Sequence, residues 1–271
     1  MSNNKIGITG GNGFIGNNFV EYLANKGYKV VSFDKESFRQ FDHKNIEWKS
    51  LDLNLCSASD FKGLIKLVHF AGSHTAEMAF EKNVKILKKT LDAVSNNPLM
   101  FYLISTYAVF GDRQTPADAQ APLIPLDDYS KSKAMAEEEL QKFISAKKIN
   151  GIIVRPNSLY GRYGKNFIDV IVDKIKNKEE IQMIYFKNQF HHVSDFCKSL
   201  EYVINIENPN PSYNIESEEV TEQTLKNIFE KLDINYVLHN KKVRSYWSKG
   251  INLKRDHSVE GYLTEAKRLS S

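Results

Sequence analysis

The chain has 271 residues, of which 41% are hydrophobic and 26% are charged, a composition typical of a globular protein with a substantial core. Its net charge of +4 is too small to indicate a nucleic-acid partner, and no apolar run is long enough to span a membrane. The two cysteines, Cys56 and Cys197, lack metal-binding or redox spacing, and no secretory signal is recognisable. We therefore expect a cytoplasmic protein with neither nucleic-acid nor membrane partners.

Short apolar runs alternate with longer amphipathic stretches in the first part of the chain. The predicted strands are 6–9, 28–33, 46–51, 67–70, 100–105 and 151–154, and the predicted helices are 14–26, 78–95 and 128–147. Strands separated by helical crossovers indicate a parallel sheet with helices on both faces, and such strands are apolar throughout, as these are. The sequence therefore predicts an α/β fold with a doubly wound parallel sheet of the Rossmann type.

The regular alternation weakens after residue 155. Residues 157–164 are predicted to form a loop, and residues 221–232 are assigned to a smaller lobe. We expect a dinucleotide-binding domain at residues 1–156. Residues 157–271 are expected to complete the sheet and to form a small C-terminal α/β substrate lobe.

Three glycines, Gly10, Gly13 and Gly16, lie at three-residue spacing between the first predicted strand and the first predicted helix. Small residues here allow a tight turn, close approach of the backbone to a diphosphate, and close packing of helix against strand. Free N–H groups at the start of the helix then face the phosphates. The turn predicts a dinucleotide site in which Phe14 and Ile15 also contact the cofactor.

An acidic residue, Asp34, ends the second predicted strand 18 residues after Gly16. A carboxylate at this point accepts hydrogen bonds from the ribose hydroxyls of the adenosine and repels a 2′-phosphate. Asp34 therefore favours NAD over NADP, although the neighbouring Lys35 leaves NADP possible.

Tyr129 and Lys133 are four residues apart in the third predicted helix, so they share one helix face. An ammonium group beside a phenol favours the phenolate and lowers the pKa of the tyrosine, which can then exchange protons near neutral pH. Ser105 and Thr106 end the fifth predicted strand, at the edge where doubly wound sheets build active sites. We expect Thr106 to hydrogen-bond the substrate oxygen that Tyr129 protonates or deprotonates.

Together these motifs resemble the extended short-chain dehydrogenase/reductase family, in particular its nucleotide-sugar epimerases and dehydratases. The matching segments are 9–16, Asp34, Asp52 with Leu53, 68–72, Asn83, 105–111, Tyr129 with Lys133, 155–161, 192–195 and 213–215. The resemblance implies that NAD or NADP is the cofactor and that a nucleotide sugar is the substrate. It also implies a homodimer formed through helices 78–95 and 128–147.

The resemblance further implies roles for individual residues. The catalytic residues would be Thr106, Tyr129 and Lys133, with Lys133 also binding the nicotinamide ribose. The cofactor-binding residues would be Gly10, Gly13, Phe14, Ile15, Asp34, Asp52, Leu53, Ala71, Gly72, Tyr129 and Lys133. The substrate-binding residues would be Ser73, Thr106, Asn157 and Arg244.

Departures from the family pattern narrow the expected reaction. Dehydratases carry an Asp-Glu pair after the catalytic threonine, whereas this chain has Tyr107 and Ala108, which excludes a 4,6-dehydratase. Epimerases carry an arginine for the substrate diphosphate, whereas residues 187–193 contain none. Lys187, or Arg244 in the basic stretch after residue 240, is the candidate replacement.

The family epimerases are also longer, so the substrate lobe looks shortened. The adjacent His191 and His192 have no third ligand nearby, so we expect them to be structural and expect no metal site.

The resemblance implies an oxidoreductase that transfers hydride at C4 of a nucleotide-activated hexose. The absent arginine and the short lobe favour a 4-keto-sugar reductase, whereas Asp34 favours a 4-epimerase that retains NAD. A non-catalytic NAD(P)-sensing module and an oxidoreductase for a non-sugar carbonyl are the remaining alternatives.

Overall fold

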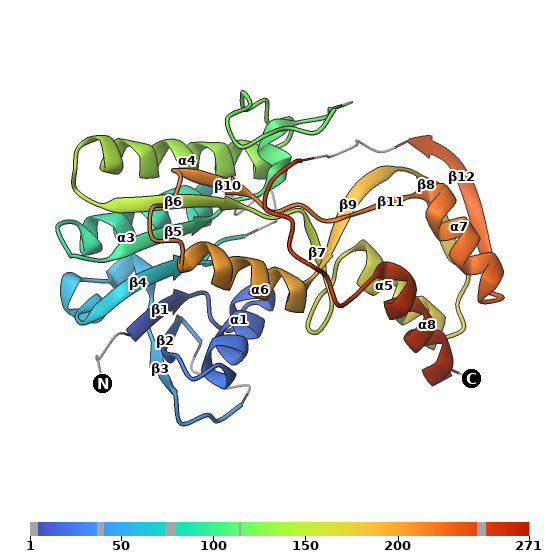
Figure 1. Cartoon of the computed structure of the whole chain (residues 1–271), viewed down its shortest axis with the longest axis horizontal. Coiled ribbons are helices and arrows are strands. Elements are labelled where there is room, and N and C mark those ends of the chain that lie inside the picture. The colour runs from blue at the N-terminus through green and yellow to red at the C-terminus, as the bar shows by residue number, and fades with distance from the viewer. Residues whose placement is uncertain (1–4, 37–40, 74–79, 114, 243–247, 271) are drawn as a thin grey trace.

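A seven-stranded parallel sheet forms the centre of the computed structural model, which describes residues 5–36, 41–73, 80–113, 115–242 and 248–270 (Figure 1). Its strands are β1 (Lys5–Thr9), β2 (Lys29–Asp34), β3 (Ile46–Ser50), β4 (Leu64–His69), β5 (Met100–Ile104), β6 (Asn150–Arg155) and β10 (Ser212–Asn214). They lie in the order β10-β6-β5-β4-β1-β2-β3, with every neighbouring pair parallel. The order reverses between β1 and β4, where open α/β sheets leave a crevice for ligands.

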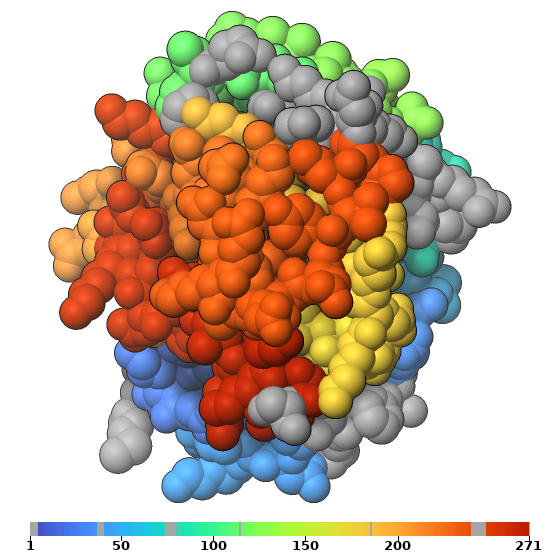
Figure 2. Space-filling model, turned by 90° about the vertical axis from the view of Figure 1, so that its right-hand side faces the viewer, coloured from blue at the N-terminus to red at the C-terminus, as the bar shows by residue number. Residues whose placement is uncertain are grey.

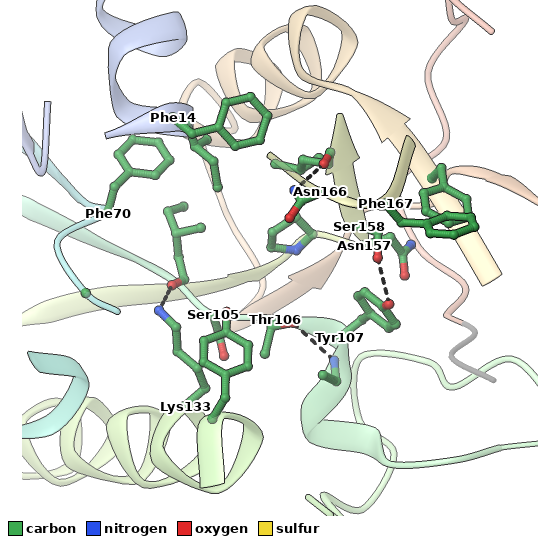
Figure 3. A pocket seen from close by; sticks show the side chains of 18 of the residues that line it. Phe14, Phe70, Ser105, Thr106, Tyr107, Lys133, Asn157, Ser158, Asn166 and Phe167 are labelled. Carbon is green, nitrogen blue, oxygen red and sulfur yellow. Dashed lines mark hydrogen bonds between the residues drawn. The ribbon is translucent and has the colours of Figure 1, made fainter. Parts of the chain in front are cut away.

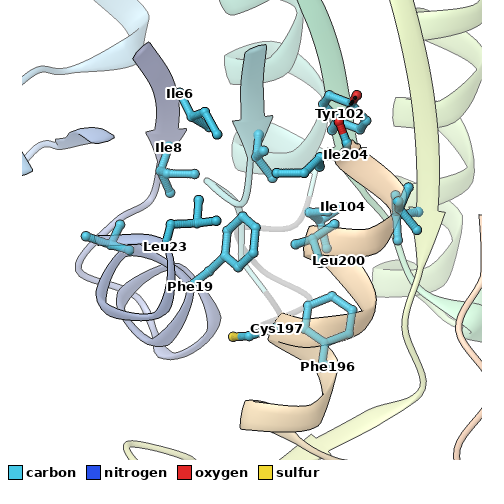
Figure 4. Close-up of a cluster of buried hydrophobic side chains, with 14 of the residues drawn as sticks. Ile6, Ile8, Phe19, Leu23, Tyr102, Ile104, Phe196, Cys197, Leu200 and Ile204 are labelled. Carbon is cyan, nitrogen blue, oxygen red and sulfur yellow. Dashed lines mark hydrogen bonds between the residues drawn. The ribbon is translucent and has the colours of Figure 1, made fainter. Parts of the chain in front are cut away.

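Helices cover both faces of this sheet (Figure 1). They are α1 (Phe14–Asn25) and α6 (Val193–Ile204) on one face, and α3 (Ile86–Val94) and α4 (Asp128–Ser145) on the other. Phe19 and Leu23 of α1 pack with Phe196 and Leu200 of α6 in one apolar cluster (Figure 4). The doubly wound parallel sheet expected from the sequence is confirmed.

Single-turn helices connect several of these elements. They are η1 (Leu53–Leu55), η2 (Ala58–Phe61), the π-helical turn η3 (Glu81–Lys85) and η4 (Tyr107–Phe110). The helix predicted at 78–95 is therefore η3 followed by α3, and its first two residues lie outside the described part of the chain.

Apart from α6 and β10, which belong to the main sheet and its covering helices, the elements after residue 155 form a second group. Figure 2 views this group from its own side, with the orange and red C-terminal segments beside the yellow segment that includes β8. Its strands are β7 (Ser158–Tyr160), β8 (Ile181–Tyr185), β9 (Lys187–His192), β11 (Glu218–Thr221) and β12 (Tyr236–Lys242), and its helices are α5 (Phe167–Lys176), α7 (Glu222–Lys231) and α8 (Val259–Ser270). The strands form a sheet of order β11-β9-β7 and a separate β12-β8 pair. An apolar cluster that includes Ile171, Met183, Phe229 and Leu263 holds these elements together. We call this group the lobe.

One local prediction was wrong. Residues 157–164 were expected to be a loop, but Ser158–Tyr160 forms the strand β7. β7 pairs in parallel with β9, a segment further along the chain, and Leu159 and Tyr160 are buried. Because this pairing is long-range, the local sequence pattern does not reveal it. Within the described residues no helix combines the length and apolar character needed to cross a bilayer.

Candidate active site

A cavity of about 810 Å³ lies at the carboxyl ends of the parallel strands and is also lined by the lobe (Figure 3). Of the site residues predicted from the sequence, its lining contains Gly10, Gly13, Phe14, Ile15, Gly72, Ser73, Thr106, Tyr129, Lys133 and Asn157. The predicted residues that lie outside this lining are Asp34, Asp52, Leu53 and Ala71. Arg244 lies outside the described residues. The structure therefore brings most of the predicted cofactor and catalytic residues to one space.

The glycine turn leaves no room for side chains at two of its positions. Gly10 has a φ of +70°, and a Cβ there would lie 2.8 Å from the backbone nitrogen of Ala71. A Cβ on Gly16 would lie 2.2 Å from the carbonyl oxygen of Gly10. The turn therefore packs directly against the segment after β4, with the N-terminus of α1 facing the cavity, and it fits the diphosphate of a dinucleotide.

Of the two acidic residues assigned to the cofactor, Asp34 contacts this turn and Asp52 begins η1. Asp34 accepts a hydrogen bond from the backbone nitrogen of Asn12 at 3.0 Å and one from that of Glu36 at 3.3 Å. Asp52 accepts one from the backbone nitrogen of Asn54 at 2.9 Å and thereby begins η1. The side chain of Leu53 is buried in the core between the sheet and α3.

The three proposed catalytic residues come from two neighbouring elements. Thr106 follows β5, and its Oγ1 accepts a hydrogen bond from the backbone nitrogen of Ala108 at 3.2 Å, which begins η4. Tyr129 lies in the first turn of α4, and Lys133 lies one turn later. Lys133 Nζ donates to the carbonyl oxygen of Ile104 at 2.8 Å (Figure 3). Side chains from the sheet edge and from α4 therefore meet in the cavity.

The electrostatics of this group differ from the sequence-based expectation. Burial raises the pKa of Tyr129 to about 12, a hydrogen bond with Thr106 opposes this shift, and the charge of Asp127 adds to it. Burial also lowers the pKa of Lys133 to about 8, against the attraction of Glu137. The expectation that Lys133 lowers the tyrosine pKa was wrong for this state, because burial of the phenol dominates. At neutral pH the pair is a phenol and an ammonium, the protonation state that can donate a proton.

A buried ion pair fixes α4 against the sheet. Arg155 at the end of β6 donates from Nε to Glu137 Oε1 at 2.9 Å and from Nη2 to Glu137 Oε2 at 2.7 Å. The Arg155 side chain is 6% exposed and the Glu137 side chain 4%. Because this fork is bidentate, it holds one face of the helix in a defined position relative to β6. Tyr129 and Lys133 are on the same helix, so the ion pair also fixes their position relative to β6.

The lobe side of the cavity was not recognised from the sequence. Alternate residues from 184 to 190 line the cavity, together with Phe167 of α5: Ile184 of β8, Phe186 between the two strands, and Asn188 and Phe190 of β9. In extended backbone, alternate residues face the same side, so one run of chain supplies this wall. The period-2 pattern is visible in the sequence, but it does not indicate which side faces a ligand.

Asn157 has an internal role that the sequence did not predict. Its Nδ2 donates to Gln189 Oε1 at 2.9 Å and to the carbonyl oxygen of Ile215 at 2.9 Å. Gln189 Oε1 also accepts from the backbone nitrogen of Ser248 at 3.0 Å. The side chain borders the cavity, but its amide nitrogen connects the segment after β6 to β9 of the lobe and to the segment after β10.

The paired histidines lie where β9 meets α6. His192 stacks on His257 with ring centroids 4.1 Å apart, and His257 is hydrogen-bonded to the buried Asp195. Burial lowers the pKa of His191 and of His192 to about 4. Across the described ranges, no group of three or more histidine, cysteine or acidic side chains is placed to hold a metal ion.

Comparison with known proteins places these features in a wider context. The model of the NAD dependent epimerase/dehydratase family matches residues 6–215. The chain is 27% identical over 263 residues to dTDP-4-dehydro-6-deoxyglucose reductase of Escherichia coli, covering 85% of this chain and 81% of that protein. It is 25% identical over 228 residues to a putative UDP-glucose 4-epimerase of Methanocaldococcus jannaschii, covering 74% and 73%.

A solved structure shares the fold across the whole chain. UDP-glucuronic acid 4-epimerase from Bacillus cereus, in complex with UDP-glucuronic acid and NAD, superimposes with a TM-score of 0.84 at 16% identity and covers 98% of both chains.

Proposed function

The chain belongs to the NAD dependent epimerase/dehydratase family, and from this premise we propose that it transfers hydride at C4 of a nucleotide-activated hexose, acting as a 4-keto-sugar reductase. The observation that carries the proposal is that Thr106, Tyr129 and Lys133 line the same cavity as the glycine turn. Residues 1–156 would hold the cofactor, and residues 157–271 would supply most of the substrate contacts.

The proposed reaction needs a hydride donor and a proton donor at one carbonyl group. The reduced nicotinamide supplies the hydride when bound. Tyr129 donates its phenolic proton to the 4-oxygen, and Thr106 hydrogen-bonds the same oxygen. The Lys133 ammonium, near the phenol, stabilises the phenolate that remains after the transfer.

The protonation state of Tyr129 supports the reductive direction. A pKa of about 12 keeps the phenol protonated at neutral pH, which suits an acid rather than a base. The similarity to the Escherichia coli reductase along 81% of its length also supports this direction. The second candidate is a 4-epimerase, supported by Asp34 and by the similarity to the Methanocaldococcus jannaschii protein.

The experiment is a screen of UDP- and dTDP-hexoses and their 4-keto forms with NADH and NADPH. Oxidation of the reduced cofactor by a 4-keto-sugar would establish the reductase. Interconversion of UDP-glucose and UDP-galactose without net change in the cofactor would establish the epimerase instead. A protein that binds NAD but converts none of these sugars would contradict both, and would leave the non-catalytic sensor and the oxidoreductase for a non-sugar carbonyl.

A further inference from the structure

A hydrogen-bonded chain of three side chains lies in the wall of the cavity and has no part in the reaction described above. Tyr107 Oη lies 3.1 Å from Ser158 Oγ and 3.1 Å from Asn188 Oδ1. All three residues line the cavity, and Figure 3 shows the contact between Tyr107 and Ser158. Tyr107 directly follows Thr106, whereas Ser158 begins β7 and Asn188 lies in β9. The chain therefore connects the catalytic edge of the main sheet to the lobe.

The direction of these hydrogen bonds follows from one backbone contact. The backbone nitrogen of Gln189 donates to Asn188 Oδ1 at 2.9 Å. A backbone N–H can only donate, so this side-chain atom is the amide oxygen, which can only accept. Tyr107 must therefore give its single proton to Asn188, and Ser158 must give its proton to Tyr107.

This direction leaves a defined pair of groups for a ligand. Ser158 Oγ already donates its proton in the hydrogen bond to Tyr107 but retains lone pairs, so it can accept a further hydrogen bond. The amide nitrogen of Asn188 carries two N–H groups, and no hydrogen bond between described residues uses them. Both residues hydrogen-bond the same Tyr107 hydroxyl and line the cavity, so a ligand hydroxyl could donate to the serine oxygen and accept from the amide nitrogen.

The apolar side chains around these two groups favour a ligand that carries a hydroxyl over one that does not. The other cavity-lining residues between 184 and 190 are apolar, namely Ile184, Phe186 and Phe190. Tyr107 itself is 5% exposed. A ligand that fills this space without a hydroxyl would leave the serine and amide groups away from water and unpaired, which costs binding free energy.

We propose that Ser158 and Asn188 form a subsite that recognises one hydroxyl of the hexose other than the reacting 4-oxygen, and that Tyr107 is the positioning residue that orients both groups. The proposal rests on the proposed function, because it takes a hexose as the ligand. Two of its three residues lie where the chain departs from its family pattern: Tyr107, and Asn188 within the segment 187–193.

The test combines changes in the protein with changes in the ligand. Calorimetry would measure binding of UDP-glucose and of its 2-deoxy, 3-deoxy and 6-deoxy analogues to the NAD-loaded protein. We expect one analogue to bind about tenfold more weakly than UDP-glucose, as is typical for loss of one hydrogen bond in a desolvated site. Ser158→Ala should abolish that difference for the same analogue and leave the other ratios unchanged.

Two further variants separate recognition from structure. Tyr107→Phe retains the ring but frees Ser158 and Asn188 to reorient. It should therefore reduce the ratio of the affinity for UDP-glucose to that for the weakly bound analogue, while the unfolding midpoint stays close to wild type. Tyr202→Phe changes an exposed tyrosine outside the cavity and should alter no ratio.

Identical ratios in the wild type, Ser158→Ala and Tyr107→Phe would overturn the subsite and leave the proposed function standing. A protein that neither binds UDP-glucose nor converts any nucleotide hexose would contradict the proposed function, and the subsite with it.

Discussion

The two ends of the cavity are built in different ways. The cofactor end consists of a glycine turn and of Thr106, Tyr129 and Lys133, each group contained in a short stretch of sequence. The lobe end is assembled from β7, β8, β9 and α5, which meet only through tertiary packing. The cofactor end therefore indicates the class of reaction, whereas the lobe end has to decide which substrate is accepted.

The two ends also differ in charge. Lys133 is in the cofactor end, and the buried pair of Glu137 on α4 and Arg155 on β6 lies behind it. The lobe end is lined mainly by aromatic and amide side chains, such as Phe186 and Asn188. Changes at the cofactor end should therefore act through charge and protonation, and changes at the lobe end through hydrogen bonding and packing.

The largest effect is expected at the proton donor. Tyr129→Phe removes one hydroxyl and should lower turnover by about 10²- to 10⁴-fold, since the phenol no longer supplies the proton. NAD binding should remain at the wild-type level, because the glycine turn is untouched. Initial rates and NAD titration would measure the two effects, and Tyr202→Phe is the control. A Tyr129→Phe variant with most of its activity would contradict the assignment of this end as catalytic.

The next effect concerns the buried ion pair that joins α4 to β6. Glu137→Leu leaves the Arg155 guanidinium buried without its partner, and should lower the free energy of unfolding by about 3–5 kcal/mol. Urea denaturation would measure this loss. Glu139→Leu, on the same helix, removes a partner of the exposed Lys142 and should have no measurable effect. Equal stabilities for the two variants would mean that the buried pair does not hold the cofactor end in place.

A third effect depends on pH. The folded pKa of Lys133, about 8, is below its ordinary value of 10.5, so folding disfavours the charged amine. The resulting loss of stability has its full size below pH 8. It shrinks as the pH rises from 8 to 10.5 and is absent above 10.5, where the unfolded state has also released its proton. Lys133→Met should therefore be more stable than the wild type at pH 7, by at most ~3 kcal/mol, and the gap should narrow at higher pH. Urea denaturation at pH 7 and pH 10 would measure the gap, and a constant gap would contradict the depressed lysine pKa.

The smallest effect is expected at the lobe end. Gln189→Leu removes the acceptor for Asn157 and for the backbone of Ser248, which should cost about 1–3 kcal/mol of stability. Because these contacts join the main sheet to the lobe, KM for the sugar should rise while kcat changes little. Gln182→Leu, at an exposed position on β8, is the matched control. A change in kcat alone would contradict the separation of the two ends.

The residues of the cofactor end could be proposed from the sequence because their chemistry depends on local spacing, and most of them line one cavity. The positions of Gly10 and Gly16 follow from a single strand–turn–helix unit, and the pairing of Tyr129 with Lys133 follows from the helical repeat. The expected doubly wound fold follows in the same way from alternating strands and helices. The predicted fall in the pKa of Tyr129 was wrong, because the extent of burial is not visible in spacing.

The fold class, the NAD-dependent family and the residues proposed for proton transfer could therefore all be inferred from local sequence patterns. Only the tertiary structure showed that Ser158, Asn188 and Tyr107 meet, and that Asn157 is held by Gln189. Local patterns record which face of a strand or helix is apolar, but strand pairing between distant segments decides which faces meet. The hydrogen-bonding groups available to the substrate depend on that pairing, and they are settled only when the lobe packs against the sheet.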